Sequence, residues 1–145
     1  MRISTKGDYG VRALIELAHH YGQGTIQSAE IAARQGIPEP YLDQLLTTLR
    51  RAGFIRSVRG PQGGHALARD PDQIRLSEVI LALEGTLSPI PHAHDEDGRR
   101  PACRAAHEVW HQVEEATYRI LEGVTIGDLA RREREYSGSG GRYYI

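Results

Sequence analysis

The most constraining feature of this sequence is the turn at residues 37–40, Ile-Pro-Glu-Pro, which separates two short segments with helical periodicity. The first segment, residues 28–35, begins at a favourable N-cap, Ser28, and is stopped by Gly36. The second, residues 40–52, begins with a proline, which suits the first turn of a helix because its missing N–H would be unpaired there. Two short helices joined by a tight turn predict a helix-turn-helix.

The segment 40–52 is amphipathic, and its polar side is the first candidate site. Its apolar side consists of leucines at helical spacing, at positions 42, 45, 46 and 49. Such a helix fits a DNA major groove, where Gln44 can pair with adenine, Tyr41 can reach a phosphate or a thymine methyl, and Asp43 can accept from a cytosine amine. The other candidate contacts on this side are Thr47, Thr48, Arg50 and Arg51. The alternative is a polar face that is only solvated.

A β-hairpin is predicted next. Residues 54–58 are rich in strand formers, and residues 65–68 can return antiparallel to them. The loop between them, Arg-Gly-Pro-Gln-Gly-Gly at 59–64, has the composition of a turn. Arg59 at the head of this loop suits a narrow minor groove, while Gly60 and Gly63 allow the backbone to approach another surface. The rival interpretation is a phosphate-cradling nucleotide loop, which the sequence disfavours because it lacks the Gly-Lys-Ser/Thr ending and a following helix.

The remaining segments complete a mainly helical fold with a small hairpin wing. A first helix is expected from Thr5, with Thr5 and Asp8 as a capping box, and a further helix is expected over residues 76–84. Residues 1–84 then form a winged helix-turn-helix domain, residues 85–101 a loop for sensing or ligand binding, and residues 102–135 a long helix and a short one. A second capping pair, Thr125 and Asp128, opens the short helix, and residues 136–145 form a flexible tail.

The long helix carries a broad apolar face that the winged domain does not need for its own closure. Self-association across a twofold axis is the common use of such a face, so a homodimer is predicted, with packing onto its own domain as the alternative. The residues of this dimerisation face are Ala106, Val109, Trp110, Val113, Thr117 and Ile120.

Charge and composition limit the function classes. The 145-residue chain has a net charge of −1, but residues 1–70 carry nine Lys/Arg and six Asp/Glu, a balance of +3. A basic first half suggests that it faces a polyanion. No apolar run approaches the roughly 20 residues of a membrane span, and no secretory signal is apparent, so a cytoplasmic protein is expected. No nucleophilic triad or paired carboxylates in a recognisable context point to an enzyme.

Four segments together resemble the bacterial winged-helix regulators of the IscR, NsrR and CymR type. They are the N-terminal MRISTKGDYG, the helix motif YLDQL at 41–45, the wing SVRGPQGGH at 57–65, and residues 79–85. The resemblance spans about residues 1–135. It implies a homodimeric DNA-binding transcription factor, often a repressor, with Tyr41 and Gln44 in the major groove and Arg59 in the minor groove. It also identifies the helix through Trp110 as the dimerisation helix.

The chain departs from the members of this family that hold an iron–sulfur cluster with three cysteines, because it has the single cysteine Cys103. A four-thiolate cluster within one chain is therefore impossible. The resemblance places Asp8 and His107 where some relatives supply cluster ligands. A regulator without a cofactor is the leading interpretation. The alternatives are a cluster with non-cysteine ligands or a zinc-type divalent site, drawn from His92, His94, Cys103, His107 and Asp8.

The sequence thus predicts a DNA-binding transcriptional regulator, a homodimeric repressor that recognises a dyad-related operator. The signal would be redox state, iron, sulfur or a small molecule. The competing hypothesis is a winged helix that serves as a protein-interaction module without specific DNA binding. A polar helix face and a wing arginine favour DNA, because protein docking surfaces are more often apolar at their centre.

Overall fold

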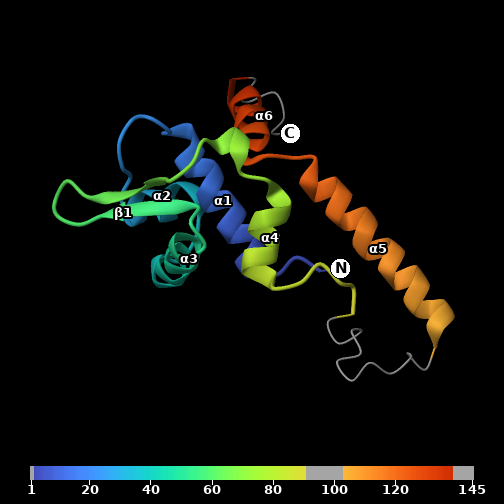
Figure 1. Ribbon diagram of the computed structural model, residues 1–145. Coiled ribbons are helices and arrows are strands. Elements are labelled where there is room, and N and C mark those ends of the chain that lie inside the picture. Colours follow the sequence, from blue (N-terminus) through green and yellow to red (C-terminus); the bar gives the residue numbers. More distant parts are fainter. Residues whose placement is uncertain (1, 91–102, 139–145) are drawn as a thin grey trace.

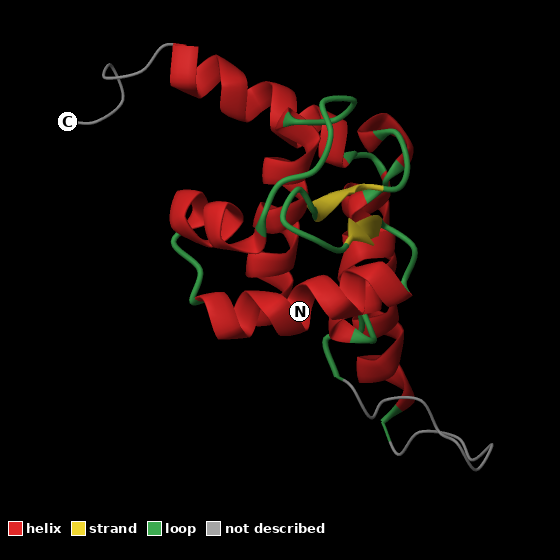
Figure 2. Ribbon diagram, turned by 90° about the vertical axis from the view of Figure 1, so that its left-hand side faces the viewer, coloured by secondary structure: helices red, strands yellow, loops and turns green. Residues whose placement is uncertain are grey.

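The computed structural model describes residues 2–90 and 103–138. Its elements are α1 (Thr5–His19), α2 (Ser28–Gln35), α3 (Glu39–Arg51), β1 (Ile55–Val58), β2 (Gly64–Leu67), η1 (Pro71–Gln73), α4 (Leu76–Glu84), α5 (Arg104–Glu122) and α6 (Ile126–Gly138). The strands form one antiparallel hairpin among the described residues, beside the helices (Figures 1 and 2). The predicted fold class, mainly helical with a β-hairpin wing, is confirmed.

The core lies around α1, which contacts α2, α3, α4 and α6. The leucine stripe of α3 is buried here as predicted, with Leu42 and Leu49 wholly inaccessible to solvent. Truncating one of them to alanine would cost about 2–5 kcal/mol of stability through lost burial and the cavity left behind. Glycines let α1 approach α4 closely: a side chain at Gly10 would overlap Leu83. This core fixes the orientation of α3 relative to the rest of the domain.

The first helix begins at Thr5 as predicted, but the proposed capping pair is wrong. Ser4 is the N-cap, and its hydroxyl accepts a hydrogen bond from the Gly7 N–H at 3.3 Å. The same hydroxyl donates to the Glu84 carboxylate at 2.5 Å, which ties the start of α1 to the end of α4. Because Thr5 is already inside the helix, Asp8 has no capping partner there and pairs instead with Arg12 at 3.4 Å.

The second capping pair is confirmed. The Thr125 N–H donates to the Asp128 carboxylate at 2.9 Å, and the Asp128 N–H donates to the Thr125 hydroxyl at 3.0 Å. The helix that follows, α6, has 13 residues and is longer than expected, since it includes residues 136–138. Ile126 and Ala130 are buried in the same core as α1. The core of the winged-helix unit therefore draws on residues far beyond position 84.

Helix α5 is the element least engaged with the rest of the molecule. It packs mainly against α4 and extends away from the body of the domain (Figure 1). None of its 19 residues is buried. No helix of the described ranges is long and apolar enough to cross a membrane.

Candidate nucleic-acid interface

The polar face of α3 is open to solvent, while the opposite face is sealed in the core. Asp43, Gln44, Arg50 and Arg51 are exposed, and Tyr41 is half-buried at the start of the helix. The side chain of Gln44 makes no hydrogen bond with any described residue, so its amide is free to contact a ligand. This arrangement presents donors and acceptors on one side of a rigid helix.

Two threonines on this face are committed to the helix itself. The Thr47 hydroxyl donates to the Asp43 carbonyl at 3.0 Å, and the Thr48 hydroxyl donates to the Gln44 carbonyl at 3.2 Å. A phosphate oxygen only accepts hydrogen bonds, so each hydroxyl would have to leave its carbonyl before it could bind a phosphate. The predicted roles of Thr47 and Thr48 stay predictions and require this change of partner.

Helix α1 holds the start of α3 in place through an aromatic contact and a cation–π contact. The rings of Tyr9 and Tyr41 meet edge to face, and the Arg12 guanidinium lies 5.1 Å from the centre of the Tyr9 ring. Arg12 also donates to the backbone carbonyl of Gln35, at the end of α2. One arginine therefore contacts both the preceding helix of the motif and the tyrosine that supports α3. Sequence reasoning did not identify Tyr9 or Arg12, although their spacing of three on α1 places them on one face.

The wing has the predicted loop, and its glycines are required by the geometry. The hairpin register pairs Val58 with Gly64, and the Gly63 N–H donates to the Gly60 carbonyl at 2.9 Å to close the turn. A Cβ on Gly63 would overlap the carbonyl oxygen of Val58, so this position excludes any other residue in the same conformation. Gly60 has a φ of 107°, a backbone conformation that side chains disfavour. Arg59 stands at the head of this turn.

The segment between α1 and α2 supports the wing, a feature that the sequence did not reveal. Ile26 and His65 exchange two backbone hydrogen bonds, of 2.9 and 2.7 Å, which form an isolated β-bridge beside the hairpin. Near the tip, Gln27 donates through its side chain to the Pro61 carbonyl at 3.3 Å. These contacts restrain the position of the wing relative to the helices.

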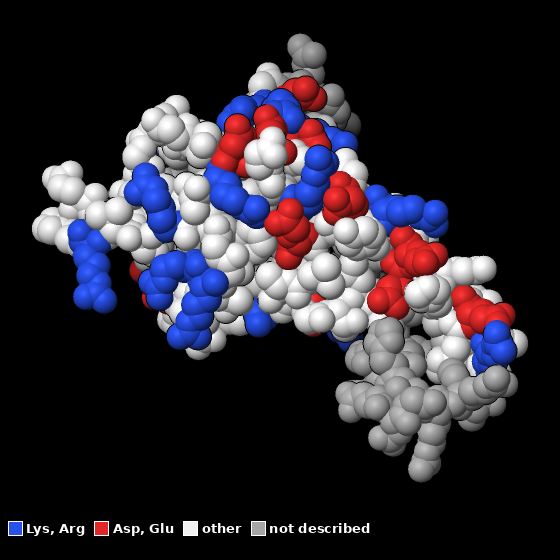
Figure 3. Space-filling model, viewed as in Figure 1, with Lys and Arg blue, Asp and Glu red and all other residues white. Residues whose placement is uncertain are grey.

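The arginines of this surface are uncommitted. Arg50, Arg51 and Arg59 form no ion pair or hydrogen bond with the residues of 2–90 and 103–138. Elsewhere, Arg34 and Arg131 pair with carboxylates at 2.7 and 2.8 Å. Figure 3 shows Lys and Arg side chains over α3 and the wing with few acidic neighbours, whereas acidic and basic side chains are intermixed over α5 and α6. The basic half predicted from the sequence is therefore a basic surface, suited to a polyanion.

His65 is a residue of β2, the strand that pairs with β1, and β1 packs against α3. Its Nδ1 is 2.8 Å from the Ser57 hydroxyl. Burial lowers the pKa of the His65 imidazole below its usual value, while Asp43 acts to raise this pKa and Arg50 to lower it. The imidazole is thus within electrostatic reach of both charged residues on α3.

The candidate metal ligands do not form a site within the described part of the chain. No three of its His, Cys, Asp or Glu residues lie close enough to share a metal ion. Cys103 is an exposed free thiol at the N-cap of α5, and Nδ1 of His107 is 2.8 Å from the Cys103 carbonyl oxygen. Asp8 is paired with Arg12. His92 and His94 lie outside the described residues. A lone cysteine does not fit a four-thiolate cluster in one chain.

The apolar face predicted for dimerisation is exposed on α5. Val109, Trp110, Val113 and Ile120 retain 49, 37, 37 and 69% of their accessible surface. Ala106 and Thr117 are half-buried. The structure thus leaves this face without a covering element among the described residues.

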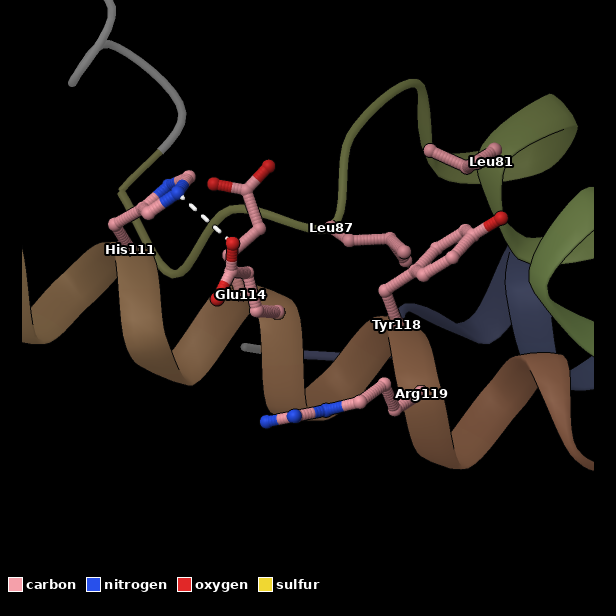
Figure 4. A pocket seen from close by; sticks show the side chains of 7 residues that line it. Leu81, Leu87, His111, Glu114, Tyr118 and Arg119 are labelled. Atoms are coloured by element: carbon pink, nitrogen blue, oxygen red, sulfur yellow. Dashed lines mark ion pairs between the residues drawn. The ribbon is translucent and has the colours of Figure 1, made fainter.

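A cavity of about 530 Å³ lies between α4 and α5 (Figure 4). Leu81, Leu87 and Tyr118 give it an apolar wall, and the ion pair between His111 and Glu115, at 3.2 Å, gives it a polar one. Helix α5, which supplies most of the lining residues, lies on the opposite side of the molecule from the hairpin (Figure 1).

The fold, the open polar face of α3 and the arginine-tipped wing define a winged-helix transcriptional regulator of the class that binds DNA. The model of the Rrf2 family, described as an iron-dependent transcriptional regulator, matches residues 3–132. The chain belongs to the Rrf2 family.

Individual relatives agree with this membership. The transcriptional regulator CymR of Bacillus subtilis is 41% identical over 130 residues, which are 90% of each chain. The structure of that protein, described as the global cysteine regulator, has a TM-score of 0.77 at 37% identity, covering 91% of this chain and 98% of its own. The structure of IscR from T. potens has a TM-score of 0.79 at 36% identity, with 100% of this chain and 97% of the other covered.

Proposed function

We propose that this chain is a sequence-specific repressor that binds a dyad-related operator as a homodimer. The observation that carries the proposal is the single surface formed by α3 and the wing, where Gln44, Arg50, Arg51 and Arg59 are all uncommitted. Relatives named as transcriptional regulators support the general function. They also favour a binding protein over an enzyme.

In this proposal α3 enters the major groove. Gln44 reads a base edge, because a side-chain amide can donate to and accept from adenine at once. Tyr41 contacts a phosphate or a thymine methyl, and Arg50 and Arg51 contact phosphates. The wing places Arg59 in the neighbouring minor groove, whose negative potential attracts a guanidinium. Gly60 and Gly63 keep the backbone of the wing tip free of side chains that would hold it away from the DNA.

The dimer follows from the exposed apolar face of α5. Val109, Trp110 and Val113 recur at spacings of one, three and four, so they form one side of the helix, and burying them against a second copy would remove this apolar area from water. Two copies related by a twofold axis would present two α3 helices to one side of a duplex. Their half-sites should be separated by about one helical turn or a multiple of it.

The test is selection of bound sequences from random duplexes, followed by titration of the selected duplex at several salt concentrations. We expect a dyad-symmetric sequence and an affinity that falls steeply with salt, because arginine–phosphate contacts release counterions. Arg59→Ala and Gln44→Ala should each weaken specific binding by roughly 1–3 kcal/mol. Arg132→Ala on the exposed surface of α6 is the matched control and should bind normally.

The same experiment distinguishes the repressor from the alternative, a winged helix that serves as a protein-interaction module. A docking module would enrich no sequence, and the Arg59→Ala and Arg132→Ala variants would retain whatever weak DNA affinity the wild type has. Capture of one palindromic sequence with loss on Arg59→Ala supports the repressor.

The signal remains part of the proposal. We propose a regulator without a resident cofactor as the first candidate, supported by the single cysteine of the chain and by the ion pair that joins Asp8 to Arg12. The alternatives are a cluster with non-cysteine ligands and a zinc-type site that includes His92 and His94. Elemental analysis and the visible spectrum of anaerobically purified protein separate them. A colourless, metal-free protein supports the first candidate, iron with broad visible bands supports the cluster, and stoichiometric zinc supports the divalent site.

A further inference from the structure

The face of the hairpin that packs on the core also carries His65, whose imidazole is half-buried at the surface of the domain. The register pairs Ile55 with Leu67 and Ser57 with His65, and side chains two apart on a strand share a face. Ile55 and Leu67 are buried in the core. That face therefore turns toward the helices, and Ser57 and His65 are the next pair along it toward the wing tip. Both are half-buried.

One nitrogen of this imidazole is held and the other is free. Nδ1 of His65 is 2.8 Å from the Ser57 hydroxyl, and its backbone is fixed by the two hydrogen bonds to Ile26. Across residues 2–90 and 103–138, no side chain or backbone group forms a hydrogen bond with Nε2. The hairpin thus fixes the orientation of the ring, and Nε2 is available to donate a hydrogen bond to a ligand.

The charged groups that act on this imidazole come from α3. They are Asp43 and Arg50, which lie seven residues apart and therefore on one face of the helix, two turns from each other. On its own hairpin, the partner of His65 is the uncharged Ser57. Because β1, the strand paired with β2, packs against α3, the face of the hairpin that packs on the core turns toward this helix, and the charges of Asp43 and Arg50 act on His65 across the space between them.

We propose that His65 binds a phosphate of the DNA strand that crosses between α3 and the wing. This inference rests on the proposed function. In a duplex the major and minor grooves are separated by a sugar–phosphate strand, so a domain with α3 in one groove and Arg59 in the next must straddle that strand. Nε2 of His65 and the guanidinium of Arg50 are the groups available there to contact it, and a protonated imidazole donates from both nitrogens.

Proton uptake accompanies this contact. In the free protein, burial and Arg50 disfavour the charged imidazole, although Asp43 favours it. A phosphate beside the ring favours the charged form, and it also neutralises the opposing effect of Arg50. The pKa of His65 is then higher in the complex than in the free protein. A group whose pKa rises on binding strengthens the complex as the pH falls, so affinity should increase from pH 8 toward pH 6.

The test measures the affinity of the intact protein for its selected duplex between pH 6 and pH 8, at fixed ionic strength. Each unit by which binding raises the pKa corresponds to about a tenfold gain in affinity at low pH for each half-site. His65→Gln should remove this gain and leave the affinity at pH 8 within about threefold of wild type. His111→Gln, on the exposed surface of α5, is the matched control and should retain the full dependence on pH.

A second measurement separates phosphate binding from a structural role. The slope of the logarithm of affinity against that of salt should fall by about one for each half-site in His65→Gln at pH 6 and stay unchanged at pH 8. A wild-type pH profile and salt slope in His65→Gln would overturn the assignment of His65 and leave the repressor proposal standing. Absence of any salt-sensitive, sequence-specific binding by the wild type would overturn both.

Discussion

The rings of Tyr9 and Tyr41 meet edge to face with their centres 5.7 Å apart and their planes at 75°. This contact joins α1, the central helix of the core, to the first turn of α3. Arg12 lies against the Tyr9 ring and also bonds the end of α2. The orientation of α3 is therefore set by aromatic packing on α1 as well as by its own leucines.

Replacing Tyr9 by leucine should lower both stability and DNA affinity. The variant keeps an apolar side chain but loses the aromatic pair and the ring beneath Arg12, which we expect to cost about 0.5–1.5 kcal/mol of unfolding free energy. Urea unfolding and operator titration measure the two effects. Tyr21→Leu, at a side chain that is 46% exposed, is the control and should change neither. Unaltered operator affinity in a folded Tyr9→Leu protein would contradict the positioning role.

Gly63→Ala should impair DNA binding through the shape of the wing. The added Cβ would overlap the Val58 carbonyl, which cannot move without opening the hairpin. We expect a loss of about tenfold or more in operator affinity with the helical content retained in circular dichroism. Gly123→Ala is the matched control, because Gly123 has a φ of −79° and the nearest atom to its added Cβ is 3.5 Å away. Equal affinities of the two variants would argue against a requirement for this turn.

Val113→Glu should separate the protomers. The substitution places a carboxylate in the apolar face of α5, where burial against a second copy would desolvate it. We expect the dimer dissociation constant to rise by about a hundredfold or more in sedimentation equilibrium. The winged-helix core should still show a cooperative thermal unfolding transition. Gln112→Glu adds the same charge one residue away, on the polar side. A wild-type monomer, or an unaffected Val113→Glu dimer, would refute this use of the face.

Asp128→Asn should change how stability depends on pH. Hydrogen bonds from the Thr125 backbone and from Arg131 lower the pKa of the Asp128 carboxyl in the folded state. A lowered folded pKa stabilises the protein at pH values above the unfolded pKa, and this contribution is lost as the pH falls through the folded value. Urea unfolding at pH 7 should show Asp128→Asn to be less stable, by under about 1 kcal/mol, because the carboxylate is only half-buried and solvent screens its charge. The difference should shrink as the pH falls below the usual carboxyl pKa and through the lowered folded value. A difference that stays constant with pH would exclude the charge as its cause.

Local signals made most of the fold predictable. The leucine stripe of α3 and the reciprocal Thr125–Asp128 cap depend on residues three or four apart, and the stop at Gly36 depends on a single glycine. All three are confirmed. The start of α1 was predicted correctly with the wrong cap, because Ser4 and Thr5 are adjacent hydroxyl residues. What distinguishes them is the hydrogen bond between Ser4 and Glu84. These residues are 80 positions apart, so no pattern of neighbouring residues indicates the contact.

The candidate interface was predictable in its composition but not in its supports. Gln44 and Arg59 stand out because a polar helix face and an arginine in a glycine-rich loop are local patterns. Tyr9, Ile26 and His65 support or flank the same surface through contacts between distant segments, and no pattern of spacing connects them. The packing of α6 against the core was missed for the same reason, since its burial depends on where α5 ends relative to the core.

The packing of α6 against α1 also bears on synthesis. A nascent chain that has emerged from the ribosome only as far as α5 lacks Ile126 and Ala130, both of which fill the core beside the first helix. The surface that carries Gln44 and Arg59 would then be completed only after α5, the helix proposed for dimerisation, has been synthesised. Chains that end before α6 should therefore compete poorly for the proposed operator and should be more exposed to proteases.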